Sequence, residues 1–329
     1  MYALSGDIGG TNARIRLIEI VHGAARVLRT ERYLSEDFDD FSSVLEKFLN
    51  DACADIPIEH VCIAAAGLVI DGTVKFTNLN WQISEKSLSQ RFNIPSVELV
   101  NDLVAAAHGI DELESQDFVE LQKGASRNHE PMAIIGVGTG FGQAMIDRSK
   151  GALRVFGSEG GHANFAPRNQ LAVDLLRHLW REKSHVSVET VLCGSGLERI
   201  YNFLLNRSEV RAPSKTCAEA IVRLAGEGDE TAKLAVTQFV GDLGAQAGNA
   251  AISYLATSGV YIVGGMISSL NYKLAAEQFL PAFNDKGPMS FLTERIPVRL
   301  VQNKDIGLLG ATAIARNRLV DSGRYSVAI

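Results

Sequence analysis

The chain carries one pattern twice: an apolar, strand-like run, a glycine turn and a second strand-like run. The first copy occupies residues 2–20 and turns at Gly9-Gly10-Thr11-Asn12. The second occupies residues 132–147 and turns at Gly138-Thr139-Gly140. Polar and apolar side chains alternate in 13–20, which is typical of a strand with one wet face. The copies lie roughly 130 residues apart, far beyond the period of a solenoid, so we expect two lobes built on related plans.

Helices and strands alternate through the rest of the chain. Helical spacing of apolar residues occurs at 41–51, 84–92, 103–108, 171–182, 197–205, 231–255 and 307–319, and short apolar strands are expected at 61–66, 97–100, 260–263 and 298–301. With 329 residues the chain exceeds the usual size of one domain. The pattern predicts an α/β protein with mixed sheets.

The composition argues against several classes of protein. Apolar residues make up 46% of the chain and charged residues 21%, which is ordinary for a folded protein. The net charge of −6 argues against a nucleic-acid partner. The four cysteines form no C-x-x-C pair, so neither a zinc site nor a disulfide framework is expected. Because we find neither a signal peptide nor an apolar run long enough to span a bilayer, we expect a soluble, cytoplasmic protein without a membrane partner.

The two glycine turns are candidate phosphate sites. Converging backbone N–H groups in such turns bind polyphosphate oxygens without a cationic side chain. Neither turn is a P-loop, because no G-K-[ST] occurs, and Phe141 stands where the dinucleotide motif needs its last glycine. Either turn alone is typical of a tight hairpin. Two matching turns, the first preceded by Asp7, favour a nucleotide, with Mg²⁺ between Asp7 and the phosphates.

Asn101 and Asp102 follow the expected strand 97–100 and precede a helix. An Asp in this position is often only a helix cap. The same edge of an α/β sheet is where ligands bind, and a carboxylate there can accept the proton of an attacking hydroxyl. The amide of Asn101 can donate to and accept from a polyol. Spacing alone leaves the cap and the base equally favoured for Asp102.

A third group of polar residues is Glu159-Gly160-Gly161-His162. The two glycines keep it out of a helix interior, and its acceptor and donor side chains can discriminate among hydroxyls. A structural histidine bonded to a loop carbonyl is the alternative for His162. Glu189 begins another expected helix, where it can simply complement the helix dipole. No spacing typical of a metal site occurs here.

Taken together, these residues resemble those of a known family. Gly6-Asp7-Ile8-Gly9-Gly10-Thr11-Asn12-Ala13-Arg14, Asn101-Asp102, Glu159-Gly160-Gly161-His162, Glu189, Gly264-Gly265 and Gly307-Leu308-Leu309-Gly310-Ala311 occur in the order found in bacterial glucokinases. Each motif is moderately specific, whereas the whole series in order over nearly the full chain is highly specific. The resemblance implies the actin-like, hexokinase-type α/β fold, with ATP and sugar in a cleft between a small lobe, 1–112 plus 305–329, and a large lobe, 113–304.

The resemblance also implies roles for individual residues. Asp102 is then the base that takes the proton from the 6-hydroxyl of glucose, and the product, glucose 6-phosphate, enters glycolysis. The implied sugar-binding set is Asn78, Asn101, Asp102, Glu159, His162 and Glu189. The implied ATP-binding set is Gly6, Asp7, Ile8, Gly9, Gly10, Thr11, Gly138, Thr139, Gly140, Gly264 and Gly265, with Asp7 holding Mg²⁺ through water. The family likeness further suggests a homodimer.

Two departures from related patterns stand out. The cysteine-rich zinc segment of a related branch of sugar kinases and repressors is absent, which fits the proteobacterial type of glucokinase. Cys193-Gly194-Ser195-Gly196 stands where a Ser-Gly-Pro-Gly-like turn is expected, and it places an oxidisable thiol near the sugar-binding segment.

Three alternatives remain open at this point. The same chemistry can act on fructose, mannose or an N-acetylated amino sugar, because the sequence does not measure the pocket around the 2-position. A non-catalytic sugar sensor on the same fold is a second alternative, although a sensor that reads DNA would carry an added helix-turn-helix. An ATPase of the actin or chaperone type would not need Glu159, His162 and Glu189.

Overall fold

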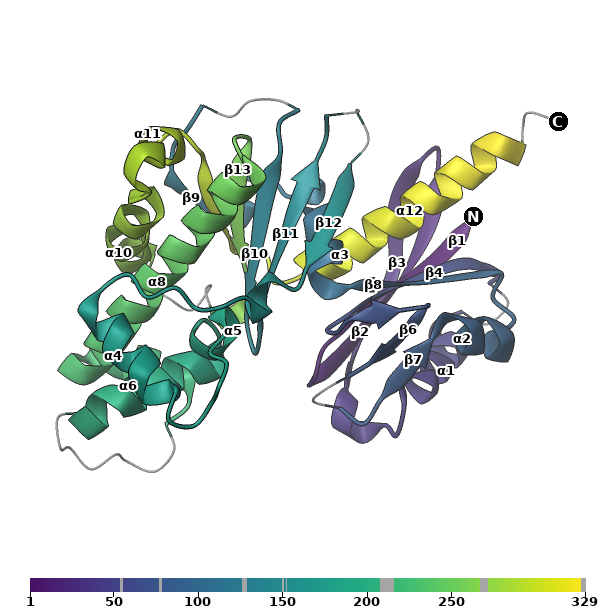
Figure 1. Ribbon diagram of the computed structural model, residues 1–329. Helices are drawn as coiled ribbons and strands as arrows, with labels where there is room; N and C mark the ends of the chain where they lie inside the picture. Colours follow the sequence, from purple (N-terminus) through teal and green to yellow (C-terminus); the bar gives the residue numbers. More distant parts are fainter. Residues whose placement is uncertain are drawn as a thin grey trace. The chain divides into compact units, whose positions relative to one another are not determined.

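The computed structural model describes residues 1–53, 56–76, 79–125, 129–149, 151, 153–207, 216–266 and 272–326 (Figure 1). The chain forms two compact units. Unit 1 consists of Met1–Leu113 together with Asp305–Ile329, and unit 2 consists of Glu114–Lys304.

Unit 1 is built on a five-stranded sheet with the order β3-β2-β1-β4-β8. Its strands are β1 (Tyr2–Ile8), β2 (Asn12–Val21), β3 (Ala24–Leu34), β4 (Ile58–Ala65) and β8 (Ser96–Asn101). β1, β4 and β8 run parallel, and Ile8 pairs with Ala65, which pairs with Asn101. The carboxyl ends of these strands therefore share one edge, which carries both the first glycine turn and Asn101.

Alternating side chains on these strands are buried in two different clusters. In β4, Ile63 packs with the helix α1 (Phe41–Ala52), whereas its neighbours Cys62 and Ala64 pack with the helices α3 (Asp102–Gly109) and α12 (Ile306–Ser326). A Cβ on Gly310 would lie 1.6 Å from the carbonyl oxygen of Ala105, so only glycine allows α12 to pack this closely on α3. The C-terminal helix thereby fixes the helix that begins at Asp102. Shorter elements complete the unit: α2 (Glu85–Phe92) and a small sheet of β5 (Val69–Ile70), β6 (Thr73–Lys75) and β7 (Gln82–Ser84).

Unit 2 has a six-stranded sheet with the order β12-β11-β10-β13-β14-β9. Its strands are β9 (Phe118–Gln122), β10 (Met132–Val137), β11 (Phe141–Asp147), β12 (Arg154–Ser158), β13 (Gly259–Val263) and β14 (Val298–Val301). The antiparallel pair β10–β11 repeats the β1–β2 pair of unit 1, and β10, β13 and β14 run parallel. The repeated pattern in the sequence thus corresponds to a hairpin in each unit.

Helices supply most of the buried core of unit 2. They are α4 (Gln170–Leu179), α5 (Val188–Val191), α6 (Gly194–Arg207), α7 (Ala218–Glu227), α8 (Glu230–Tyr254), α10 (Tyr272–Asn284) and α11 (Ser290–Thr293). The long helix α8 passes through this core and buries Phe239 completely. Both units combine helices with mixed sheets, and the predicted α/β class is confirmed.

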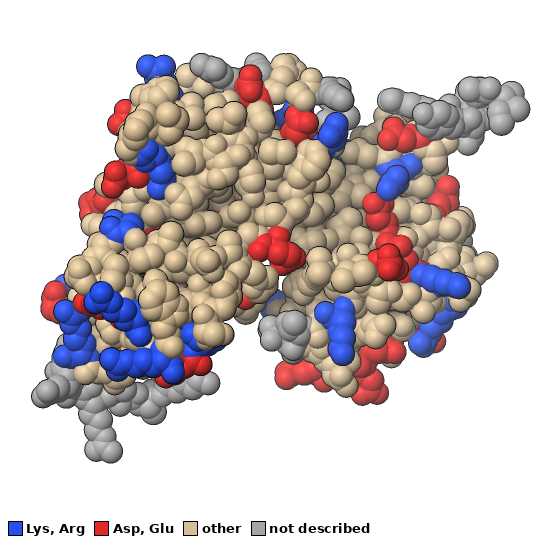
Figure 2. Space-filling model, in the orientation of Figure 1, with Lys and Arg blue, Asp and Glu red and all other residues tan. Residues whose placement is uncertain are grey.

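The surface charges and the cysteines show no sign of a membrane segment or a disulfide among the described residues. Acidic and basic side chains are interspersed on the face shown in Figure 2. Among the described residues, no helix is long and apolar enough to cross a membrane. All four cysteines are free thiols, and only Cys217 is exposed. Cys193 is buried with its Sγ 3.2 Å from the Oγ of Ser195, so the thiol expected to be oxidisable is shielded from solvent.

Candidate active site

Asn101 is the cap of helix α3. Its Oδ1 accepts the backbone N–H groups of Leu103 and Val104, at 3.0 and 3.3 Å. Its Nδ2 donates to the carbonyl oxygen of Gly67, at 3.2 Å. Both lone pairs of Oδ1 are therefore used, and one amide N–H remains for a ligand. Asn101 can donate this N–H to a polyol, and its contact with a sugar stays a prediction.

Asp102 is the first residue of α3 and is partly buried. The pKa of its carboxyl group is raised to about 6: burial raises it most, the N–H of Leu103, 2.9 Å from Oδ1, lowers it, and the nearby charge of Asp7 adds a smaller upward shift. At pH 7 the group is then roughly nine-tenths ionised. A carboxylate whose pKa lies this close to neutrality is suited to accept a proton during a reaction.

Asp7 lies one residue before the end of β1 and forms an ion pair with Arg14 on the neighbouring strand. Arg14 also pairs with Asp305. Burial raises the pKa of Asp7, and the Arg14 guanidinium opposes this shift. The sequence led us to expect a metal ion beside Asp7. The structure places the guanidinium of Arg14 next to this carboxylate.

The described residues contain no group of three or more His, Cys, Asp or Glu side chains that could hold a metal ion. Mg²⁺ in kinases is usually bound by only one or two carboxylates, with phosphates and water as its other ligands. Asp7 therefore fits a water-mediated contact with a Mg²⁺ ion that ATP brings. It does not fit a preformed metal cage.

The second glycine turn connects β10 to β11. The N–H of Gly138 donates to the carbonyl of Gly140, and the carbonyl of Gly138 accepts the N–H of Gly194 at the start of α6, both at 2.9 Å. A Cβ on Gly138 would meet no atom within 4 Å, and the same is true of Gly265. Packing within the protein therefore does not require glycine at either position, and both leave space beside the backbone.

Gly264 is a glycine for a different reason. Its φ of 125° is unfavourable for any other residue, and a Cβ there would lie 2.0 Å from the carbonyl oxygen of Val137. This contact holds the end of β13 against the end of β10, beside the second glycine turn. Gly264 thus allows the backbones of β13 and β10 to approach each other, whereas Gly138 and Gly265 leave open space beside the backbone.

Glu159 precedes a single 3₁₀ turn, Gly160–His162, and His162 is the last residue of that turn. Both side chains are exposed, and the Oε2 of Glu159 lies 3.7 Å from the Nε2 of His162. The histidine that contacts a loop carbonyl is His185, whose Nε2 lies 2.9 Å from the carbonyl oxygen of His162.

Glu189 lies in the first turn of α5. Its Oε2 accepts the backbone N–H of Phe141 at 2.8 Å, immediately after the second glycine turn. The residue therefore binds the hairpin that carries Gly138, Thr139 and Gly140, in addition to standing at a helix start. Asn78, the remaining predicted sugar ligand, lies outside the described residues.

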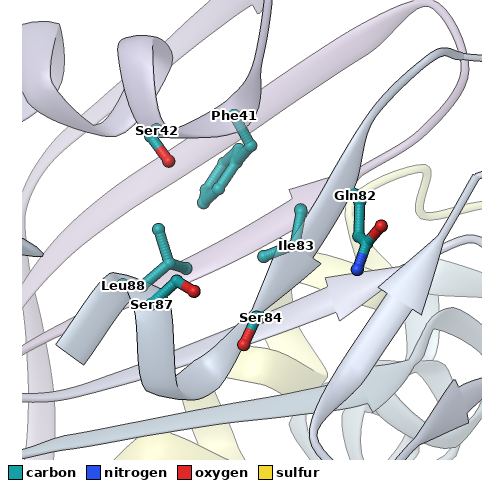
Figure 3. A pocket seen from close by; sticks show the side chains of 7 residues that line it. All are labelled: Phe41, Ser42, Gln82, Ile83, Ser84, Ser87 and Leu88. Atoms are coloured by element: carbon teal, nitrogen blue, oxygen red, sulfur yellow. The ribbon is translucent and has the colours of Figure 1, made fainter. Parts of the chain in front are cut away.

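A separate cavity of about 230 Å³ lies in unit 1, between the start of α1 and the β7–α2 junction (Figure 3). Its lining includes the apolar side chains of Phe41, Ile83 and Leu88 and the hydroxyls of Ser42, Ser84 and Ser87. None of the predicted site residues contributes to it, and no titratable side chain lines it. The cavity therefore supplies no carboxylate or imidazole that could serve as a general base.

The hairpin repeated in each unit and the mixed α/β sheets fit the actin-like, hexokinase-type fold of sugar kinases. A family model described as Glucokinase matches residues 4–318. A glucokinase from Nostoc sp. is 37% identical over 335 residues, which cover 95% of this chain and 98% of that protein. The chain belongs to the glucokinase family, whose members phosphorylate glucose with ATP.

Solved structures agree with this assignment. A glucokinase from an Antarctic psychrotroph has a TM-score of 0.84 and 33% identity, and the match covers 96% of this chain and 99% of that one. A glucokinase of the ROK family from Streptomyces griseus, solved with glucose and AMPPNP, has a TM-score of 0.66 at 22% identity and covers 96% of this chain and all of that one, 100%. The second match supports the fold.

Proposed function

We propose that this protein transfers the γ-phosphate of ATP to the 6-hydroxyl of glucose, with Asp102 as the general base. The products are glucose 6-phosphate, which enters glycolysis, and ADP. The observation that carries the proposal is the carboxylate of Asp102, raised in pKa by burial and located where β8 meets α3. In a chain of this family, such a group is matched to the task of accepting one proton near neutral pH.

The chemical step needs little covalent help from the protein. The transition state of phosphoryl transfer is loose, so the base mainly orients the attacking hydroxyl. As the bond between the sugar oxygen and phosphorus forms, the proton passes to Asp102 and the bond to the ADP oxygen breaks. Asp102 then returns its proton to solvent when the product leaves.

Glucose is bound, in this proposal, by hydrogen bonds to its hydroxyls. Carboxylates accept from hydroxyls, whereas the remaining amide N–H of Asn101 donates to one. The proposed set is Asn78, Asn101, Asp102, Glu159, His162 and Glu189. The exposure of the Glu159 and His162 side chains leaves both available to a ligand. The glucose complex of the Streptomyces griseus glucokinase supports glucose as a ligand of this fold.

ATP is bound, in this proposal, by backbone groups of the glycine turns. The first turn contributes Gly6, Asp7, Ile8, Gly9, Gly10 and Thr11, the second Gly138, Thr139 and Gly140, and the end of β13 Gly264 and Gly265. The open space beside Gly138 and Gly265 supports a close approach of the nucleotide to the backbone. The AMPPNP complex of the Streptomyces griseus protein supports a nucleoside triphosphate on this fold. Asp7 would hold Mg²⁺ through water, and the ion would neutralise charge on the phosphates.

A coupled assay with ATP, Mg²⁺ and single hexoses tests the proposal. Glucose is expected to give the highest kcat/KM in a panel with fructose, mannose and N-acetylglucosamine. Chelation of Mg²⁺ with EDTA should abolish turnover, and added Mg²⁺ should restore it. Binding of glucose without turnover of any hexose would contradict the proposal and favour a sugar sensor.

The resemblance further suggests a homodimer in the cytoplasm. Sedimentation equilibrium of the purified protein tests the homodimer, for which we expect a mass near twice the 35.5 kDa of one chain.

A further inference from the structure

A closed set of hydrogen bonds lies beneath the loop that carries Glu159 and His162. Gln143 on β11 faces Ser158, the last residue of β12, as its antiparallel partner. The hydroxyl of Ser158 donates to the Gln143 carbonyl at 2.9 Å and lies 3.3 Å from the hydroxyl of Tyr254, at the end of α8. The side chain of Gln143 donates to that same Tyr254 hydroxyl at 2.9 Å.

The donors and acceptors in this set are consistent with one another. Tyr254 accepts from Gln143 Nε2 and donates to Ser158 Oγ, which in turn donates to the carbonyl of Gln143. Ser158 also accepts the N–H of Gly160, at 3.3 Å, from within the loop itself. On its other side, the Oε1 of Gln143 accepts from Gln246 of α8, at 3.1 Å. The loop is therefore connected to α8 through Gln143 and Tyr254, neither of which belongs to a motif recognised in the sequence.

The loop is shaped to receive Gln143. A Cβ on Gly160 would lie 2.2 Å from Gln143 Nε2, so the glycine lets the amide lie directly against the loop backbone. The side chains of Glu159 and His162 are both exposed, and their Oε2 and Nε2 atoms lie 3.7 Å apart. Their positions consequently depend on the backbone between them, and that backbone rests on Gln143 and Ser158.

We infer that Gln143 and Tyr254 are positioning residues for glucose binding: they hold the Glu159–His162 loop in the orientation that the sugar needs, and they touch neither substrate. The inference rests on the proposed role of Glu159 and His162 in glucose binding. Glucose binding then also depends on Gln143 and Tyr254, which are 111 residues apart in the sequence and act only through this loop.

Tyr254→Phe removes the shared hydroxyl and leaves the ring. It should raise the Kd for glucose about 2- to 13-fold, because a typical hydrogen bond contributes about 0.5–1.5 kcal/mol, whereas the KM for ATP should stay within about twofold. Tyr261→Phe is the matched control, since it removes a hydroxyl that accepts from Arg299 at 3.0 Å elsewhere in unit 2. The control should leave the Kd for glucose within about twofold.

A panel of monodeoxyglucoses separates positioning from general loosening. Glu159→Gln should weaken the analogues unequally, with the smallest loss for the analogue that lacks the hydroxyl Glu159 binds. Tyr254→Phe should rank the analogues in the same order. An equal loss for all analogues, or a loss no greater than that of Tyr261→Phe, would overturn the inference.

Gln143→Met gives an independent variant in case Tyr254→Phe folds poorly. The double variant should bind glucose no more weakly than the weaker single variant, because both changes break the same set of bonds. Multiplied losses would show that the two residues act separately and would also overturn the inference. The wild-type assay with glucose is run first, so a failure of the proposed function appears there and a failure of the positioning role appears only in the variants.

Discussion

Asn101 and Asp102 divide two tasks at the start of α3. Asn101 accepts the N–H groups of Leu103 and Val104 and so caps the helix, whereas Asp102 is its first residue and carries a carboxyl group with a pKa of about 6. The adjacent cap relieves Asp102 of that structural duty. The alternative that Asp102 serves only as the cap therefore loses its main physical support.

Replacing Asn101 by Ala should lower the free energy of unfolding by about 1 kcal/mol, the usual cost of a lost N-cap. It also removes the bond to Gly67. Urea denaturation measures the change. Asp40→Ala is the control, because Asp40 caps α1 by accepting the N–H of Ser43 at 2.7 Å. It should cost a similar free energy but leave kcat unchanged. An Asn101→Ala variant as stable as the wild type would contradict the cap assignment.

Asp102→Asn should stabilise the fold above pH 7. A raised carboxyl pKa means that the folded protein holds the proton more tightly than the unfolded chain. Stability from this group is therefore greatest below pH 3.8 and falls as the pH rises through 6. The full shift corresponds to at most about 3 kcal/mol, which the neutral amide should recover. Denaturation midpoints at pH 8 and pH 4 test this, and a variant less stable than the wild type at pH 8 would argue against a buried charge.

The rate of glucose phosphorylation should depend on pH through Asp102. Only the ionised carboxylate accepts a proton, so kcat/KM for glucose should be near its maximum above pH 7. Below pH 6, the pKa of Asp102, it should fall about tenfold per pH unit. A profile measured from pH 4.5 to 8 locates this limb. An acid limb centred near pH 4, the ordinary range of an exposed Asp, would show that the base is not in this buried environment.

Gly138→Ala and Gly264→Ala should separate ligand approach from packing. An Ala at 138 meets no atom within 4 Å, so its free energy of unfolding should change by less than about 0.5 kcal/mol while the KM for ATP rises. An Ala at 264 would approach the Val137 carbonyl to 2.0 Å and should cost more than about 1 kcal/mol. Thermal denaturation and the ATP dependence of turnover give both values. An unchanged KM for ATP in Gly138→Ala would remove this turn from the nucleotide site.

Periodic apolar segments were predictable because burial shapes their sequence directly. The long helix expected at 231–255 is α8 (Glu230–Tyr254), and the strands expected at 2–8 and 132–137 match β1 and β10. β3 was not predicted, because most of its side chains are exposed and its backbone is held by pairing with β2. The helix α10 was also missed, and Pro281 inside it is a poor helix signal.

Residues of the candidate site could be proposed from the sequence where they stand in a local motif. Contacts between residues that are distant in the sequence could not be proposed in this way. Asp102 and Glu159 stand in recognisable motifs, whereas the pairing of Asp7 with Arg14 comes from strand register. The alternation of polar and apolar residues placed Arg14 on the solvent-facing side of its strand. It did not identify Asp7 as the partner of Arg14, because that pairing depends on the register of the hairpin. No local signal connects Gln143 to Tyr254, since only the fold brings β11 to the end of α8.

The kcat of Asp102→Asn with saturating glucose and ATP tests the central claim most directly. The amide keeps the shape of the side chain but cannot accept the proton, so kcat should fall about 10²- to 10⁴-fold. Glucose binding, measured by calorimetry on the same sample, should persist and show that the site is intact. A kcat within about tenfold of the wild-type value would contradict the assignment of Asp102 as the catalytic base.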